Sequence, residues 1–103
     1  MKTLTTEDIT DTLRGMSNYV LLDFWAQWCG PCRALGETLQ GLENTFPNIH
    51  FYKINVDENK ELAREYNIMS IPTVVIMKDG IEVDRLVGAR VKSELTEYLS
   101  KLA

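Results

Sequence analysis

Cysteine is scarce in this 103-residue chain, which has two, both within the segment Trp28-Cys29-Gly30-Pro31-Cys32. Two cysteines are too few for the disulfide framework of a small secreted domain, so a catalytic or metal-binding pair is favoured. Histidine is scarcer still, because His50 is the only one. Zinc takes three or four protein ligands, and no further residue has the required spacing. We therefore expect no metal site and interpret His50 as an ordinary edge histidine.

Long apolar runs and basic clusters are also missing. No window approaches the roughly 18 apolar residues that a membrane-spanning helix requires. The net charge of −4, without a basic patch, argues against a nucleic-acid partner. Residues 1–8 lack the apolar core of a secretory signal and carry acidic residues that transit peptides avoid. We expect a cytoplasmic protein without nucleic-acid or membrane partners, although a trimmed mature form would look the same.

The hydrophobic pattern predicts an α/β fold in a single domain over residues 1–103. A nearly continuous apolar run at 19–25 is typical of a strand buried on both faces. The expected elements are a first helix after Thr6, this strand, a helix after Cys32 that ends at Pro47, a strand over 49–56, a short helix from Asp57 or Asn59, strands over 73–77 and 81–87, and a last helix from about Val91. Asp79-Gly80 between the last two strands indicates an antiparallel hairpin.

The Cys-X-X-Cys segment lies between a strand and a helix, so Cys29 is expected at a helix N-terminus. The free N–H groups and the helix dipole there lower a thiol pKa and favour the thiolate. Pro31 suits the first helical turn, and Gly30 leaves the approach to the sulfur open. We interpret Cys29 as an exposed attacking thiol and Cys32 as a shielded resolving thiol. A metal site and an inert pair of thiols are the alternatives, and Gly-Pro between the cysteines favours redox exchange over both.

Four segments together resemble thioredoxins over nearly the whole chain: Trp28–Cys32, residues 20–26, Ile71-Pro72-Thr73, and Val87-Gly88-Ala89. The resemblance implies the thioredoxin fold, with a central mixed sheet of four or five strands, four flanking helices, and a C-terminal antiparallel hairpin followed by a helix. It implies one thioredoxin domain over 1–103. The implied activity is reduction of protein disulfides by dithiol–disulfide exchange through Cys29 and Cys32.

Asp23 is an acid within an apolar strand, so desolvation should raise its pKa. By resemblance, Asp23 lies beneath the disulfide and handles the proton of Cys32. A carboxylate at the strand end, satisfied by the following turn, is the alternative. Lys53 shares strand parity with Phe51 and is expected to face Asp23, unless its ammonium group extends to the sheet edge instead.

The resemblance also implies a substrate surface around Cys29. Thioredoxins have a cis proline at the position of Pro72, so we expect a cis Ile71–Pro72 bond whose neighbouring backbone groups pair with an extended substrate. Trp28 is expected to form a wall beside the thiol, with a role in the core as the alternative. The expected substrate-binding residues are Trp28, Gly30, Pro31, Ile71, Pro72, Val87, Gly88 and Ala89.

No bound cofactor is expected, because the redox group is the Cys29–Cys32 pair itself. The resemblance implies a thioredoxin reductase that supplies electrons from NADPH or ferredoxin, disulfide-containing protein substrates, a monomer, and a role in electron transport and cell redox homeostasis. A thiol oxidase or isomerase of the same fold is a competing function, against which Gly30-Pro31 argues. A second competing function is that of a binding module in a larger complex, in which the redox pair is incidental.

Two positions depart from the family pattern. Arg33 replaces a commoner lysine and keeps the positive charge. Glu37 occupies the place of a helix-kinking proline, so the helix is expected to be straighter or to bend at Gly36.

Overall fold

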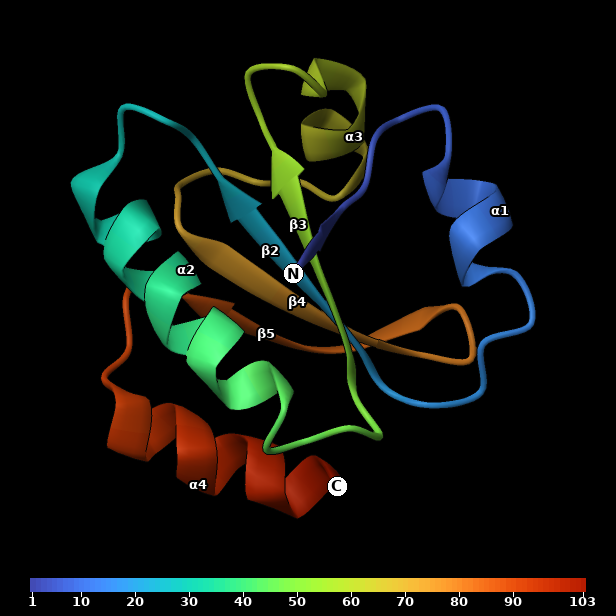
Figure 1. Cartoon of the computed structure of the whole chain (residues 1–103). Helices are drawn as coiled ribbons and strands as arrows, with labels where there is room; N and C mark the ends of the chain where they lie inside the picture. Colours follow the sequence, from blue (N-terminus) through green and yellow to red (C-terminus); the bar gives the residue numbers. More distant parts are fainter.

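The computed structural model describes residues 1–103 as a central sheet with helices on both faces (Figure 1). The elements are β1 (Lys2–Thr3), α1 (Ile9–Leu13), β2 (Val20–Trp25), α2 (Gly30–Glu43), β3 (His50–Asn55), α3 (Lys60–Glu65), β4 (Thr73–Lys78), β5 (Ile81–Val87) and α4 (Lys92–Leu102). The predicted mixed sheet and its four helices are confirmed, and the sheet has five strands. The sequence pattern did not locate β1, because a two-residue strand has no measurable periodicity.

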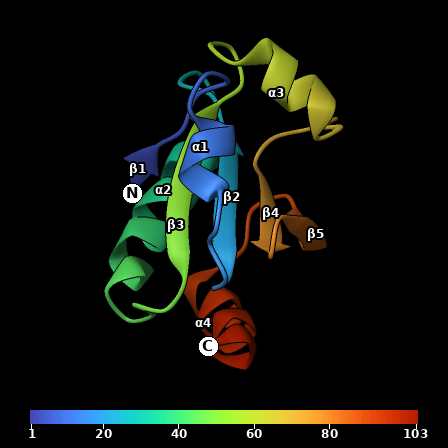
Figure 2. The same cartoon turned by 90° about the vertical axis from the view of Figure 1, so that its right-hand side faces the viewer.

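The sheet has the strand order β1-β3-β2-β4-β5, with β1 and β5 at opposite edges (Figure 2). Strands β1, β3 and β2 are parallel, whereas β4 is antiparallel to both β2 and β5. Helix α2 forms the crossover between the parallel strands β2 and β3. The predicted hairpin is confirmed, since Asp79 and Gly80 join β4 to β5 with φ values of 53° and 78°. Positive φ at both positions is the requirement of the turn that suits a two-residue hairpin.

Two hydrophobic clusters cover the two faces of the sheet. One joins Leu21 of β2 to Leu39 of α2 and Leu99 of α4. The other joins Leu22 of β2 to α1 and to Leu62 of α3. Because side chains alternate along a strand, β2 supplies both clusters, which explains its continuous apolar run. Asp23 is therefore on the α2 and α4 face, in line with Leu21.

Candidate active site

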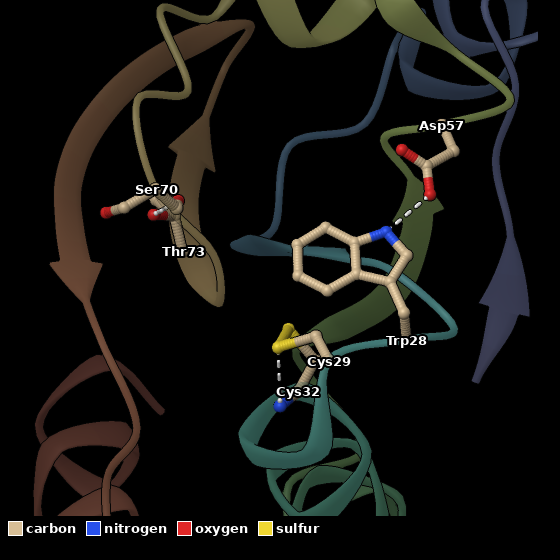
Figure 3. Close-up of a disulfide and its surroundings, with 6 residues drawn as sticks. All are labelled: Trp28, Cys29, Cys32, Asp57, Ser70 and Thr73. Atoms are coloured by element: carbon tan, nitrogen blue, oxygen red, sulfur yellow. Dashed lines mark hydrogen bonds between the residues drawn. A yellow bond between two sulfur atoms is a disulfide. The ribbon is translucent and has the colours of Figure 1, made fainter.

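Cys29 and Cys32 form a disulfide at the start of helix α2. Cys29 is the N-cap residue and Pro31 lies in the first turn, as the sequence predicts. The N–H of Cys32 donates to Sγ of Cys29 at 3.2 Å (Figure 3). This sulfur therefore lies where the unpaired N–H groups and the dipole of α2 favour negative charge.

The expectation that Cys29 is exposed is wrong for this disulfide state. Cys29 is 6% exposed and Cys32 is 1% exposed. The two cysteines pack against Trp25, Val56 and Ile71, which come from three different parts of the chain. This packing could not be inferred from the motif alone, because Val56 and Ile71 are distant from it in sequence. The predicted order is kept, since Cys29 is the more accessible of the two.

Trp28 projects beside the disulfide, and its side chain is 70% exposed (Figure 3). Its Nε1–H donates to Oδ2 of Asp57 at 2.8 Å. The alternative of a core tryptophan is therefore wrong. Asp57 was not predicted as part of the site, although Trp28 and Asp57 follow the neighbouring parallel strands β2 and β3. The C-terminal ends of parallel strands meet at one edge of a sheet, and this rule could have found the pair.

The predicted substrate-binding residues meet at this same end of the sheet. Phe24 near the end of β2 pairs with Thr73 at the start of β4, and Thr73 pairs with Val87 at the end of β5. This register places three predicted groups around the disulfide: Trp28, Gly30 and Pro31 before and within α2, Ile71 and Pro72 before β4, and Val87, Gly88 and Ala89 after β5.

The Ile71–Pro72 peptide bond is cis, as predicted. The N–H of Gly88 donates to the carbonyl of Pro72 at 2.9 Å, which ties the end of β5 to this bond. The N–H and C=O of Ile71 take part in no hydrogen bond within the chain. Beside Ile71, an apolar groove of about 350 Å³ extends from Trp28 to Met69 and was not predicted. Its other lining residues are Val56, Ala63, Ile68 and Ser70.

Asp23 lies inside β2 and is 1% exposed, so the alternative of a strand-end carboxylate is wrong. Its Oδ1 has no hydrogen-bond partner. Burial raises the pKa of Asp23 to about 7, and the nearby charge of Lys53 partly opposes this rise. The predicted upward shift of the pKa is confirmed.

Lys53 is the direct cross-strand neighbour of Asp23 in the β2–β3 pairing. Its Nζ lies 5.2 Å from the centroid of the Trp25 ring. The structure forms no salt bridge between Lys53 and Asp23. Lys53 thus faces the carboxyl as predicted, but its ammonium group lies over the indole ring.

A cavity of about 240 Å³ adjoins Asp23 and Cys32, and Lys53 also lines it. Two residues of α2 that depart from the family pattern, Arg33 and Glu37, complete its charged wall. Helix α2 continues without a break through Glu37. The cavity therefore brings three charged side chains, Lys53, Arg33 and Glu37, to the neighbourhood of the buried carboxyl.

The structure holds no group of three or more His, Cys, Asp or Glu side chains that could bind a metal ion. His50 begins β3 and belongs to no such group. None of the helices has both the length and the apolar character needed to cross a membrane.

The thioredoxin family model matches residues 1–101. The chain belongs to the thioredoxin family. It is 47% identical over 87 residues to "Thioredoxin" of Chlamydia pneumoniae, covering 84% of this chain and 85% of that protein. It is 46% identical over 83 residues to "Thioredoxin-2" of Pyricularia oryzae, covering 81% of this chain but only 48% of that protein. The X-ray structure of Fasciola hepatica thioredoxin superposes with a TM-score of 0.91 at 36% identity and covers 100% of both chains.

Membership in the thioredoxin family, together with the Cys29–Cys32 disulfide, makes this chain a thiol–disulfide oxidoreductase with protein-disulfide reductase activity. Thioredoxins carry no cofactor, because the disulfide within the chain is the redox group. Proteins of this family act on disulfide substrates and are recycled by a reductase.

Proposed function

We propose that Cys29 attacks the substrate disulfide and that Cys32 resolves the resulting mixed disulfide. The observation that carries this assignment is the position of the Cys29 sulfur at the N-cap of α2, where it accepts the N–H of Cys32 at 3.2 Å. A thiolate is stabilised at this position by the helix dipole and by that N–H group. Cys32 lies one turn further into the helix and is the more deeply buried of the two residues.

The reaction transfers two electrons from the dithiol to the substrate. The Cys29 thiolate forms a bond to one substrate sulfur, the substrate S–S bond breaks, and the departing thiolate takes up a proton. Cys32 then gives its proton to the Asp23 carboxylate and attacks Sγ of Cys29. This attack breaks the S–S bond between Cys29 and the substrate, and the released substrate thiolate takes up a proton. The substrate thus leaves as a dithiol, and the chain retains the Cys29–Cys32 disulfide.

Asp23 suits this proton transfer because it shares a cavity with Cys32 and has a pKa of about 7. A group whose pKa lies near the working pH accepts and releases protons with similar ease. Lys53 has the supporting role of stabilising the ionised carboxyl from the neighbouring strand.

Substrates dock as an extended segment against the free N–H and C=O of Ile71. The cis Pro72 follows this pairing position, and the exposed Trp28 side chain forms a wall of the groove that Ile71 also lines. Gly30, Pro31, Val87, Gly88 and Ala89 complete the contact surface.

We further assign the chain to a single domain over residues 1–103 that works as a monomer in the cytoplasm, in electron transport and cell redox homeostasis. A thioredoxin reductase that draws electrons from NADPH or ferredoxin is the expected partner. The net charge of −4 without a basic patch fits the absence of nucleic-acid partners, and no membrane partner is expected.

Covalent trapping tests the order of attack. In Cys32→Ser, the mixed disulfide cannot be resolved, so a protein-disulfide substrate should accumulate as an adduct on Cys29, visible by non-reducing electrophoresis and mass spectrometry. Cys29→Ser is the matched control and should form little adduct. Adduct formation mainly on Cys32 in that control would contradict the assignment.

A further inference from the structure

Strand β5 contains a bulge next to its partner β4. The β4–β5 register shifts between Ile76 and Met77, because Ile76 faces Asp84 whereas Met77 faces Glu82. Val83 is left as the extra residue between them. In a regular strand, side chains three positions apart point to opposite faces of the sheet. When a bulge inserts one extra residue between them, they point to the same face.

The bulge therefore puts Glu82 and Arg85 on one face of the sheet, where they form a two-pronged ion pair. Nε of Arg85 donates to Oε2 of Glu82 at 2.7 Å, and Nη2 donates to Oε1 at 2.8 Å. The Arg85 side chain is only 26% exposed. A guanidinium held in this way has a fixed plane, so its remaining N–H groups point in defined directions.

Those N–H groups meet the end of helix α3. Nη2 of Arg85 donates to the carbonyl of Tyr66 at 2.6 Å, and Nη1 donates to the carbonyl of Asn67 at 3.2 Å. Tyr66 is the C-cap residue, and Asn67 has a φ of 54°, in the left-handed region. Carbonyls at a helix C-terminus have no partner within the helix, and a cation is favoured there.

The segment that begins at these carbonyls leads directly to the substrate position. Four residues after Asn67 comes Ile71, whose N–H and C=O are free. The far end of the segment is held by the hydrogen bond from Gly88 to Pro72. Strand β5 and the residue that follows it thus hold both ends of the segment, Arg85 at the beginning and Gly88 at the end.

We propose that Arg85, oriented by Glu82, is a positioning residue for substrate docking: it holds the Tyr66 and Asn67 carbonyls and so fixes the backbone of Ile71 for pairing. The proposal rests on the proposed function, because it takes Ile71 as the backbone to which protein disulfides pair. It assigns Arg85 no contact with the reacting sulfurs. The hydrogen bonds with Arg85 are also the main reason that the pKa of Glu82 lies below its usual range.

The same strand supplies a matched control on its other face. Asp84 accepts a hydrogen bond from the hydroxyl of Tyr98 in α4. Replacing Asp84 by Asn perturbs β5 at the neighbouring residue without removing either bond to the α3 carbonyls. A general weakening of the hairpin would therefore appear in both variants, whereas a positioning effect would appear only at Arg85.

The test compares wild type, Arg85→Met, Arg85→Lys and Asp84→Asn in the reduction of insulin and of a small disulfide, dithiobis(nitrobenzoate), with dithiothreitol as electron source. Arg85→Met should raise KM for insulin about threefold or more and change kcat by less than about twofold, since the bond-making groups are untouched. Reduction of the small disulfide, which needs no backbone pairing, should be unchanged. Arg85→Lys should give an intermediate KM, because an ammonium group cannot replace the planar fork.

Hydrogen exchange gives a readout that does not depend on turnover. The backbone amides of residues 68–71 should exchange faster in Arg85→Met than in Asp84→Asn. The two variants are compared under conditions in which their free energies of unfolding are equal. The proposal is overturned if both Arg85 variants have the wild-type KM for insulin and the wild-type exchange rates at residues 68–71. If Arg85→Met does not fold, the same comparison is made with Arg85→Lys alone. A wild-type protein that reduces neither disulfide would instead overturn the proposed function, and the positioning role with it.

Discussion

Asp23 and Lys53 face each other on the parallel strands β2 and β3, yet they form no ion pair. They are direct partners in the β2–β3 register. Nζ of Lys53 lies 5.2 Å from the Trp25 ring centroid, and Oδ1 of Asp23 has no hydrogen-bond partner. The lysine therefore acts on the carboxyl through its field and leaves it free to take up a proton. This arrangement keeps the pKa of the buried Asp23 near neutrality.

The buried Asp23 should make folding stability fall as the pH rises. Its pKa is about 7 in the folded chain, whereas an unfolded carboxyl titrates near about 3.9. Between these values the folded state holds a proton that the unfolded state has lost, so the free energy of unfolding decreases with rising pH. At 1.36 kcal/mol per pKa unit, this one group removes about 4 kcal/mol between about pH 4 and pH 7.

Asp23→Asn cannot ionise, so it should be more stable than wild type above about pH 7 and similar to it near about pH 4. Urea unfolding of both proteins across this range measures the difference. Asp11→Asn, at an exposed position, is the control and should track wild type. A constant difference between Asp23→Asn and wild type at all pH values would contradict the assignment of the raised pKa to Asp23.

Removing the charge of Lys53 should raise the pKa of Asp23 above about 7, because that charge lowers it in the wild type. The variant Lys53→Met keeps the side-chain length and tests this directly by NMR titration of the Asp23 carboxyl carbon. Lys78→Met is the matched control, because Lys78 also lies over an aromatic ring, that of Tyr19, at 4.3 Å from its centroid. Equal Asp23 titration curves in wild type and Lys53→Met would show that the lysine has no electrostatic influence on the site.

The hydrogen bond between Trp28 and Asp57 should orient the exposed indole beside the cysteines. Asp57→Ala should lower the free energy of unfolding by about 1 kcal/mol or less, because the bond is at the surface. It should nevertheless speed hydrogen exchange at the indole N–H of Trp28 and raise KM for insulin. Glu58→Ala removes the adjacent exposed carboxylate and should change neither the indole exchange rate nor KM for insulin. Unchanged indole exchange in Asp57→Ala would indicate that the bond does not restrain the ring.

The features that were predictable from the sequence are those carried by local patterns. The apolar run of β2 predicted a strand buried on both faces, and Asp79-Gly80 predicted the hairpin. Gly30-Pro31 between two cysteines predicted the start of α2 at the disulfide. Asp23 was recognisable because a carboxylate among apolar strand residues has no local means of avoiding desolvation.

The features that were not predictable depend on residues that meet only in the folded chain. Cys29 is buried in a cluster with Ala26 and Cys32, and the Val56 and Ile71 side chains that pack against this cluster are far from it in sequence. The link from Arg85 to Tyr66 spans 19 positions and requires a bulge at Val83, which has no sequence signature in this chain. Strand parity correctly placed Lys53 on the same face of the sheet as Asp23. Whether its ammonium group lies against Asp23 or over the Trp25 ring depends on side-chain geometry, which strand parity does not determine.

The equilibrium redox potential of the Cys29–Cys32 pair tests the reductase function most directly. It is measured by titrating the purified protein against glutathione and against a stronger dithiol, with the disulfide fraction determined by thiol trapping. A protein-disulfide reductase should have a potential near about −270 mV, the region typical of thioredoxins. A potential near about −120 mV would mark a disulfide donor and would contradict the proposal that this chain works as a reductant.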